Sequence, residues 1–265
     1  MAKQSGPLTA AQWHVRGEAL KQLSRLPESL SCLDKAVQLD STLKGAWLDR
    51  ATVLVQLGRL DEAAGSAETA LRLDPQDPKA WALMAIALGL AGRHQEALAA
   101  LDRGLQLTPN DMPMLNNKGR ALEALGRFEE AITAYDRSLS IDPISTHTWS
   151  NKGEVLNRLS RFEEAIPCFE RSITVDKTNF HACFGMAYAL TLSNRVDEAF
   201  VYLSRTLEIN PRFELAWNHK GLLHSALGDP RAALACFERA AALGMEGAEE
   251  SAARCRQEIQ ERPRQ

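Results

Sequence analysis

The stretch NNKGRALEALGRFEEAITAYDRSLSIDP, residues 116–143, is followed by SNKGEVLNRLSRFEEAIPCFERSITVD, residues 150–176, a near copy displaced by 34 residues. The same spacing extends in both directions. It gives seven registers, which start at residues 10, 44, 78, 112, 146, 180 and 214 with no insertion or deletion. A fixed period of this length is typical of chains that stack one small structural unit several times. The repeat therefore decides the fold.

Certain repeat positions hold the same kind of side chain in nearly every register. When each register is numbered from 1 to 34, positions 8, 20 and 27 take small residues and position 4 takes tryptophan in five repeats: Trp13, Trp47, Trp81, Trp149 and Trp217. Apolar residues recur at helical spacing at positions 4, 7–8, 11 and 14, and again at positions 20–21, 24, 27–28 and 30. The pattern predicts two antiparallel helices per repeat, which approach closely where the small residues lie.

Position 15 separates the two predicted helices. It is glycine in four registers and Ser24, Ser160 or Asn194 in the others. Glycine and asparagine readily take the left-handed conformation that ends a helix. Acidic residues at positions 18 and 19 suit the positive end of the next helix, and a proline at position 32 stops that helix in four registers.

These residues resemble the tetratricopeptide repeat family, whose 34-residue unit carries the pattern W-x₂-L-G…A-x₃-F…P. The resemblance covers residues 10 to about 245 and rests on seven consecutive registers. It implies an all-α fold, a right-handed superhelical solenoid of helix–turn–helix repeats.

The two ends of the array carry their own signals. Thr9 and Gln12 have the spacing of a capping box at the start of the first helix. After the seventh repeat, Ala248, Ala252, Cys255 and Ile259 form a narrow apolar stripe in a charged segment, as expected of a C-terminal capping helix. We expect fifteen helices and no sheet in one continuous array: an N-terminal extension at residues 1–9, seven repeats at 10–246, and the capping helix and tail at 247–265.

Composition excludes several classes of function. A net charge of −3 lacks the basic excess of a nucleic-acid-binding protein. No apolar run reaches the length of a membrane span, and the N-terminus has no secretory signal. The five cysteines are odd in number and include no CxxC pair, which argues against disulfides and zinc. We therefore expect a cytoplasmic protein that uses no cofactor and no metal and binds neither nucleic acid nor membrane.

In the family that the sequence resembles, the first helix of each repeat lines a concave groove that binds partner proteins. Positions 2, 5, 6, 9, 12 and 13 of that helix vary here, and we interpret them as free of packing duty. They predict a groove that is apolar in repeats two, three, six and seven and polar in repeats four and five. The predicted partner-binding residues are Leu48, Ile86, Asn116, Asn117, Arg120, Asn151, Glu154, Arg158, Phe184, Tyr188 and Asn218.

The two central repeats offer asparagine amides to a ligand. Asn117 and Asn151 share position 6, and an amide matches the donor and acceptor of a peptide backbone. Chaperone-tail binders of the family use Lys at position 5 and Asn at position 9 of one repeat. No register here has that pair, which argues against chaperone tails as ligands.

Two other patterns have a structural interpretation. Arginine recurs at position 16 in six registers, and we interpret it as bonding to carbonyls of the preceding turn rather than to phosphate. His147 and His181 share position 2 but lack a third metal ligand. No Walker loop, dinucleotide-binding glycine pattern, HExxH or G-x-S-x-G motif occurs, so we predict no enzyme.

The sequence thus predicts a non-enzymatic scaffold or adaptor that holds an extended or helical segment of a partner protein in its groove. Two alternatives stay open at this point. The chain could self-assemble as a structural solenoid, with homo-oligomerisation through its ends or outer face, or it could be a regulatory subunit of an enzyme complex.

Overall fold

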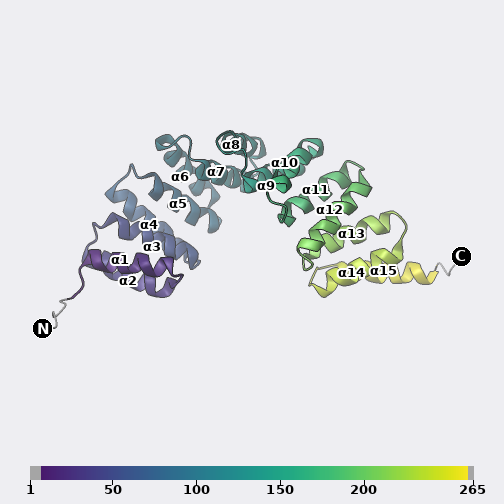
Figure 1. Ribbon diagram of the computed structural model, residues 1–265, viewed down its shortest axis with the longest axis horizontal. Coiled ribbons are helices and arrows are strands. Elements are labelled where there is room, and N and C mark those ends of the chain that lie inside the picture. Colours follow the sequence, from purple (N-terminus) through teal and green to yellow (C-terminus); the bar gives the residue numbers. More distant parts are fainter. Residues whose placement is uncertain (1–6, 262–265) are drawn as a thin grey trace. The chain divides into compact units, whose positions relative to one another are not determined.

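A computed structural model describes residues 7–261, which contain fifteen α-helices and no strand (Figure 1). The first helix of each repeat occupies positions 1–13: α1 Ala10–Gln22, α3 Lys44–Gln56, α5 Pro78–Leu90, α7 Met112–Ala124, α9 Thr146–Arg158, α11 Phe180–Leu192 and α13 Glu214–Ala226. The second follows after a three-residue turn: α2 Leu26–Leu39, α4 Leu60–Leu73, α6 His94–Leu107, α8 Phe128–Ile141, α10 Phe162–Val175, α12 Val196–Ile209 and α14 Pro230–Ala242. We call these the A and B helices. The all-α prediction is confirmed.

Every A helix ends in the same way. All seven residues at position 15 have positive φ, from 58° at Ser24 and Ser160 and 61° at Asn194 to 77° at Gly92. The next amide then donates back to the carbonyl of position 11, as from Arg59 to Leu54 at 2.9 Å. This left-handed turn satisfies a carbonyl that the helix end would otherwise leave unpaired. The predicted break is confirmed, including the three registers that lack glycine.

The arginines at position 16 do not serve the purpose that the sequence indicates. Each one donates to the glutamate three residues later rather than to a carbonyl. In five of the six repeats, Nε and Nη2 each lie 2.7 Å from a carboxylate oxygen, as in Arg59–Glu62 and Arg195–Glu198. Arg25 pairs with Glu28 in the same way. These hydrogen bonds lower the pKa of the paired glutamates. The arginine row is therefore neutralised locally.

Tryptophan ties four of the repeats to the loops that precede them. The indole Nε1 of Trp47, Trp81, Trp149 and Trp217 donates to the carbonyl six residues earlier, at 2.8–3.0 Å. The rings are half-buried, since one edge packs between helices while the N–H reaches the loop. In these four repeats, the residue at position 4 thus fixes the loop before its own helix as well as filling the core.

The chain divides after Asp142 into two compact units. The first holds repeats one to four. The second holds repeats five to seven and α15, Ala248–Glu261. Within each unit of Figure 1, successive helices lie side by side in chain order. The domain boundaries and the superhelix expected of the whole array stay predictions, and the predicted tail falls partly outside the described residues.

The two ends of the array are closed by different structures. At the start, Thr9 and Gln12 form the predicted capping box. At the end, Ala252 and Cys255 of α15 pack on Ala233 and Phe237 of α14, which confirms the capping helix.

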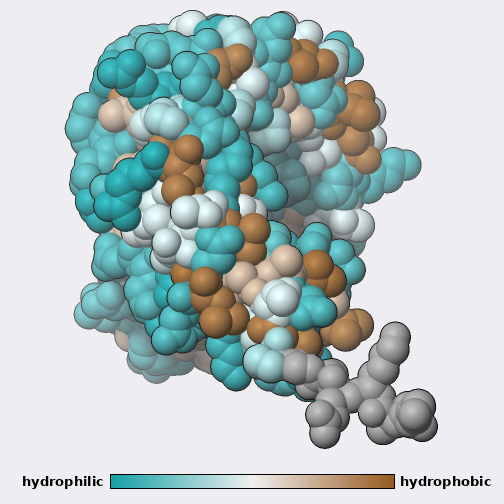
Figure 2. Space-filling view, turned by 90° about the vertical axis from the view of Figure 1, so that its left-hand side faces the viewer, coloured by the Kyte–Doolittle hydropathy of each residue, from teal (hydrophilic) through white to brown (hydrophobic). Residues whose placement is uncertain are grey.

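The face shown in Figure 2 is mostly hydrophilic, with hydrophobic residues in small separate patches.

The core of a repeat depends on a pairing between positions 8 and 24. Where position 24 is aromatic, position 8 is glycine, as in Gly119 with Tyr135. A Cβ added at Gly119 would lie 2.3 Å from Cε1 of that ring. The other aromatic pairs are Gly153 with Phe169 and Gly221 with Phe237, whereas alanine at position 8 meets leucine or alanine. Absent side chains thus make room for large ones.

A buried carboxylate joins the first two repeats. Asp49 on α3 accepts from Lys21 Nζ at 2.5 Å and lies 2.8 Å from His14 Nε2, both on α1. Burial alone would raise the pKa of the Asp49 carboxyl, but the hydrogen bonds from Lys21 and His14 outweigh it, and the pKa lies below its ordinary value. The charged form of Asp49 is therefore the stabilising form.

Asp49→Asn is expected to lower the free energy of unfolding by about 1–2 kcal/mol at neutral pH, because a neutral amide bonds the Lys21 ammonium less well than a carboxylate does. A depressed folded-state pKa gives stability that is present above the unfolded value of about 4 and is lost as the pH falls through the folded value. Urea unfolding between pH 3 and pH 7 should therefore show wild type and variant converging at the acid end. Glu18→Gln, at an exposed position of α1, is the control. A difference that does not depend on pH would contradict the assignment.

Candidate protein-interaction surface

The A helices present two kinds of position on the face that the sequence singles out. Positions 5, 6 and 12 are half-buried or buried everywhere except at Val15 in the first repeat and Ser225 in the last. Positions 2, 9 and 13 are exposed in most repeats, and position 13 in all of them. We call positions 5, 6 and 12 the seam, and positions 2, 9 and 13 the open stripe.

The seam joins successive A helices. A side chain at position 12 contacts position 6 of the next repeat at three junctions: Lys21 with Asp49, Asn157 with the Gly185 carbonyl at 3.0 Å, and Thr191 with His219 at 2.9 Å. Val15 and Ser225 are exposed because they have no such neighbour. The interpretation that positions 5, 6 and 12 are free of packing is therefore wrong. Single-helix periodicity identifies the side that faces the B helix, but not the side that faces the next repeat.

In the first unit, the predicted residues fall on both parts of the surface. Leu48 belongs to the seam and is only 6 % exposed, packed with Leu71 and Ala80. Leu48 therefore packs between successive repeats and is not available to a ligand in the groove. Asn116 and Asn117 also lie in the seam and are half-buried, whereas Ile86 and Arg120 occupy the open stripe.

Asn117 lies at an unusual point of the seam. Its counterpart at position 12 of the preceding repeat is Gly89, which offers no side chain. Apart from its chain neighbours and the backbone of α5 itself, the only described heavy atom within 4 Å of a Cβ added at Gly89 is the Cβ of Ala97, at 3.9 Å. No described residue hydrogen-bonds to the Asn117 amide. The amide therefore faces a gap in the seam.

In the second unit, Asn151, Phe184 and Asn218 lie in the seam and are half-buried. Glu154, Arg158 and Tyr188 lie in the open stripe, where Arg158 and Tyr188 are exposed. The open stripe of this unit thus changes from charged in repeat five to apolar beyond it.

Repeats six and seven carry an aromatic cluster, which consists of Phe180, His181, Phe184, Tyr188, Phe213 and His219. Phe213 is central: its ring meets Phe180 and Phe184 edge to face, with centroids 5.2 and 5.1 Å apart. His219 lies 5.9 Å from both Phe184 and Tyr188. Edge-to-face pairs at these separations are favourable. Phe180 and Phe213 were not predicted, because positions 1 and 34 read as helix start and loop. Their aromatic character is the signal that could have found them.

His219 is uncharged at neutral pH, since burial lowers its pKa. Thr191 donates its hydroxyl proton to the Ala187 carbonyl at 2.8 Å, so the same hydroxyl accepts from His219 Nε2. This assigns the ring proton to Nε2 and leaves Nδ1 as an acceptor. His219 therefore adds no charge to the cluster at neutral pH.

Four large apolar side chains of the open stripe are exposed beside the cluster. They are Tyr188 at 40 %, Leu192 at 48 %, Leu215 at 41 % and Leu222 at 51 %, all on α11 and α13. Exposed hydrophobic side chains gathered on one face mark interaction sites more often than scattered ones do. This stretch is the candidate surface.

Other kinds of site receive no support from the described residues. No group of three or more His, Cys, Asp or Glu side chains there could hold a metal ion. His181, considered above with His147, stacks on Phe180 with ring centroids 4.1 Å apart. None of the described helices is long and apolar enough to cross a membrane. All five cysteines are buried free thiols.

Comparison with known protein families identifies the repeat. Models described as tetratricopeptide repeat match residues 14–78, 48–112, 110–178 and 215–243. Together with the seven registers and the paired helices, these matches show that the chain belongs to the tetratricopeptide repeat family. Proteins of this family are generally non-catalytic interaction scaffolds, and the fold supports that general role here. No curated protein sequence matches the chain.

Solved structures share the fold at low sequence identity. A tetratricopeptide repeat protein from Parabacteroides merdae superimposes with a TM-score of 0.72 at 15% identity, over 93% of this chain and 98% of that one. The APC/C hetero-tetramer Cut9–Hcn1 gives 0.72 at 17% identity, over 93% of this chain and 48% of its own. YrrB, described as a TPR protein with an unusual peptide-binding site, gives 0.59 at 18% identity, over 71% and 97%. At these identities the likeness shows the fold alone.

Proposed function

We propose that this protein is a non-enzymatic scaffold whose A-helix face binds an apolar or amphipathic segment of a partner protein. The observation that carries the proposal is the exposed apolar stripe of α11 and α13, formed by Tyr188, Leu192, Leu215 and Leu222. The aromatic cluster beneath it is rigid, because its rings pack on one another. A preorganised surface loses little entropy when a ligand docks.

In each unit, polar side chains on the A helices add a preference for certain ligand groups. Asn117 in the first unit has an unpaired amide beside Gly89, so its donor and acceptor are available to a peptide group. In the second unit, Asn218 lies next to the aromatic cluster at position 5 of α13. Arg120 in the first unit and Arg158 in the second are exposed cations of the open stripe. Such groups select among apolar segments by their flanking residues.

A triple variant tests the proposal. Tyr188→Ser, Leu192→Ser and Leu222→Ser together are expected to leave the melting temperature within a few degrees of wild type, because these side chains are already half exposed. The same variant is expected to weaken binding to the partner at least tenfold, since it removes most of the apolar contact area. The partner is identified by affinity capture and crosslinking, and its affinity is then measured by calorimetry with purified proteins.

The matched control carries Leu23→Ser, Leu39→Ser and Leu227→Ser, three leucines that are 59–68 % exposed and stand outside repeat positions 2, 9 and 13. It should bind the partner as wild type does. If both triple variants bind equally well, the face is wrongly assigned. If light scattering shows that wild type self-associates and the first variant does not, the stripe instead joins copies of this chain.

A further inference from the structure

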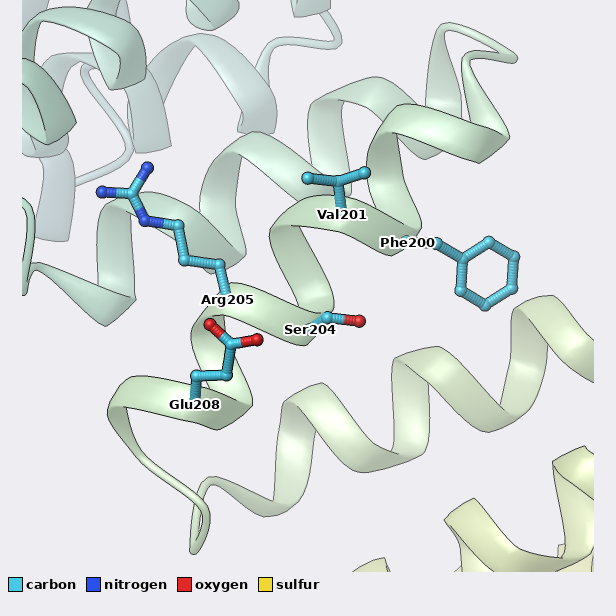
Figure 3. A pocket seen from close by; sticks show the side chains of 5 residues that line it. All are labelled: Phe200, Val201, Ser204, Arg205 and Glu208. Carbon is cyan, nitrogen blue, oxygen red and sulfur yellow. The ribbon is translucent and has the colours of Figure 1, made fainter.

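The B helix of the sixth repeat borders a shallow depression of about 540 Å³, and none of its lining residues belongs to the A-helix stripe. Phe200, Val201, Ser204, Arg205 and Glu208 line it, all from successive turns of α12 (Figure 3). Val201 is 65 % exposed, and the Phe200 ring packs on His224 with centroids 4.7 Å apart. The floor is therefore part apolar and part polar.

The repeat shows what Ser204 replaces. Position 25 holds Asp or Glu in every other repeat. At two junctions where position 7 of the next repeat is basic, the two residues pair across the junction. Arg50 Nε lies 2.7 Å from Asp34, and Lys118 Nζ lies 2.6 Å from Asp102. Each pair is separated by sixteen residues in the sequence.

At the junction of repeats six and seven the cation is present without its carboxylate. Lys220 Nζ donates to Ser204 Oγ at 3.2 Å, and within residues 7–261 it forms no ion pair. Lys220 is half-buried. A half-buried ammonium that has lost part of its hydration without gaining a counter-charge favours an anion more than a fully solvated lysine does. Two other junctions show the opposite case, in which position 25 is acidic but position 7 of the next repeat is a methionine, Met84 or Met186.

The charges around the depression favour an acidic ligand at one end. Arg205 is a second cation, and its Nη2 donates to the Lys177 carbonyl at 3.2 Å. Glu208 lies one helical turn beyond Ser204 and makes that end negative. An incoming carboxylate is therefore directed to the Ser204 end, next to Phe200 and Val201.

We propose that this depression binds an acidic residue of a partner protein together with an apolar neighbour. The carboxylate takes the place that Asp34 and Asp102 fill at the equivalent junctions, on Lys220 and Ser204. The apolar neighbour packs on Val201 and Phe200. This surface lies on a B helix, so it serves a second contact, independent of the A-helix stripe.

Blocked tripeptides test the site on the intact chain. Acetyl-Phe-Asp-Leu-amide is titrated into ¹⁵N-labelled protein and compared with its asparagine counterpart, while the backbone amide shifts of residues 200–208 are followed. In wild type, the aspartate peptide is expected to shift these amides with an affinity at least fivefold higher than that of the asparagine peptide, because only a carboxylate pairs with Lys220.

Two variants remove the preference by opposite means. Ser204→Asp supplies the carboxylate from within, so it is expected to abolish the preference and to raise the melting temperature by about 1–3 °C. Lys220→Met copies the residue found at Met84 and Met186 and is expected to abolish the preference too. Equal affinity for the two peptides in wild type, shifts that fall elsewhere or nowhere, or a preference that survives in Lys220→Met would each overturn the proposal.

Discussion

Phe169→Ala is expected to lower the free energy of unfolding by about 3–5 kcal/mol, the usual cost of a cavity left by a buried aromatic ring. The Phe169 ring is fully buried. Glycines flank it on both sides: a Cβ added at Gly153 would lie 2.8 Å from the ring, and one added at Gly185 would lie 2.5 Å from it. The ring thus fills space left by α9 and α11 as well as by its own helix. Neither flanking glycine can fill the void, so little relaxation is expected.

Urea unfolding followed by circular dichroism measures this loss. Val175→Ala, at an exposed position of the same helix, is the control and should change stability by less than about 0.5 kcal/mol. Because repeats are stabilised mainly by their neighbours, the variant is expected to unfold α9–α11 before the rest of the second unit. A loss below about 1 kcal/mol in a single cooperative transition would contradict the packing described here.

Gly119→Ala is expected to destabilise the first unit by about 2–3 kcal/mol, although alanine is the better helix former by about 1 kcal/mol. The added methyl group would lie 2.3 Å from Cε1 of Tyr135, whose ring is fully buried. Tyr135→Leu alone should cost a similar amount, because it leaves a cavity opposite the glycine.

The double variant is the informative measurement. Gly119→Ala with Tyr135→Leu recreates the pairs that the chain already uses at Ala85 with Leu101 and Ala187 with Leu203. It is therefore expected to be more stable than the sum of the single losses by about 1–2 kcal/mol. Tyr135→Phe separates the contribution of the hydroxyl group, which donates to Glu123. Simple additivity in this double-mutant cycle would show that positions 8 and 24 do not depend on each other.

The sequence predicts the fold well because each repeated residue type follows from a backbone requirement. The residue at position 15 must adopt the left-handed backbone conformation, and Ser24, Ser160 and Asn194 do so although they are not glycine. Thr9 and Gln12 form the expected cap because that motif involves only one turn of helix. Predictions of the backbone conformation within a single helix or turn therefore succeed.

The site was harder to predict because its properties depend on contacts between repeats. Helical periodicity gives no sign that Leu48 is covered by the next repeat, or that Thr191 bonds His219. The glutamates that pair with the position 16 arginines lie only three residues away in the sequence, so these ion pairs could have been predicted from the sequence. The missing acid at Ser204 is visible only when it is compared with position 25 of the other repeats.

The hydrogen bond between four of the tryptophans and the loop six residues before each of them has a consequence for biosynthesis. In either unit, the extensive contacts of a helix are with helices adjacent or next-but-one in the chain. When a hairpin leaves the ribosome, the surface on which it docks has thus already been translated, and no later segment is needed to complete that junction. Folding is expected to advance repeat by repeat as the chain leaves the ribosome, so that little apolar surface is exposed to solvent during synthesis.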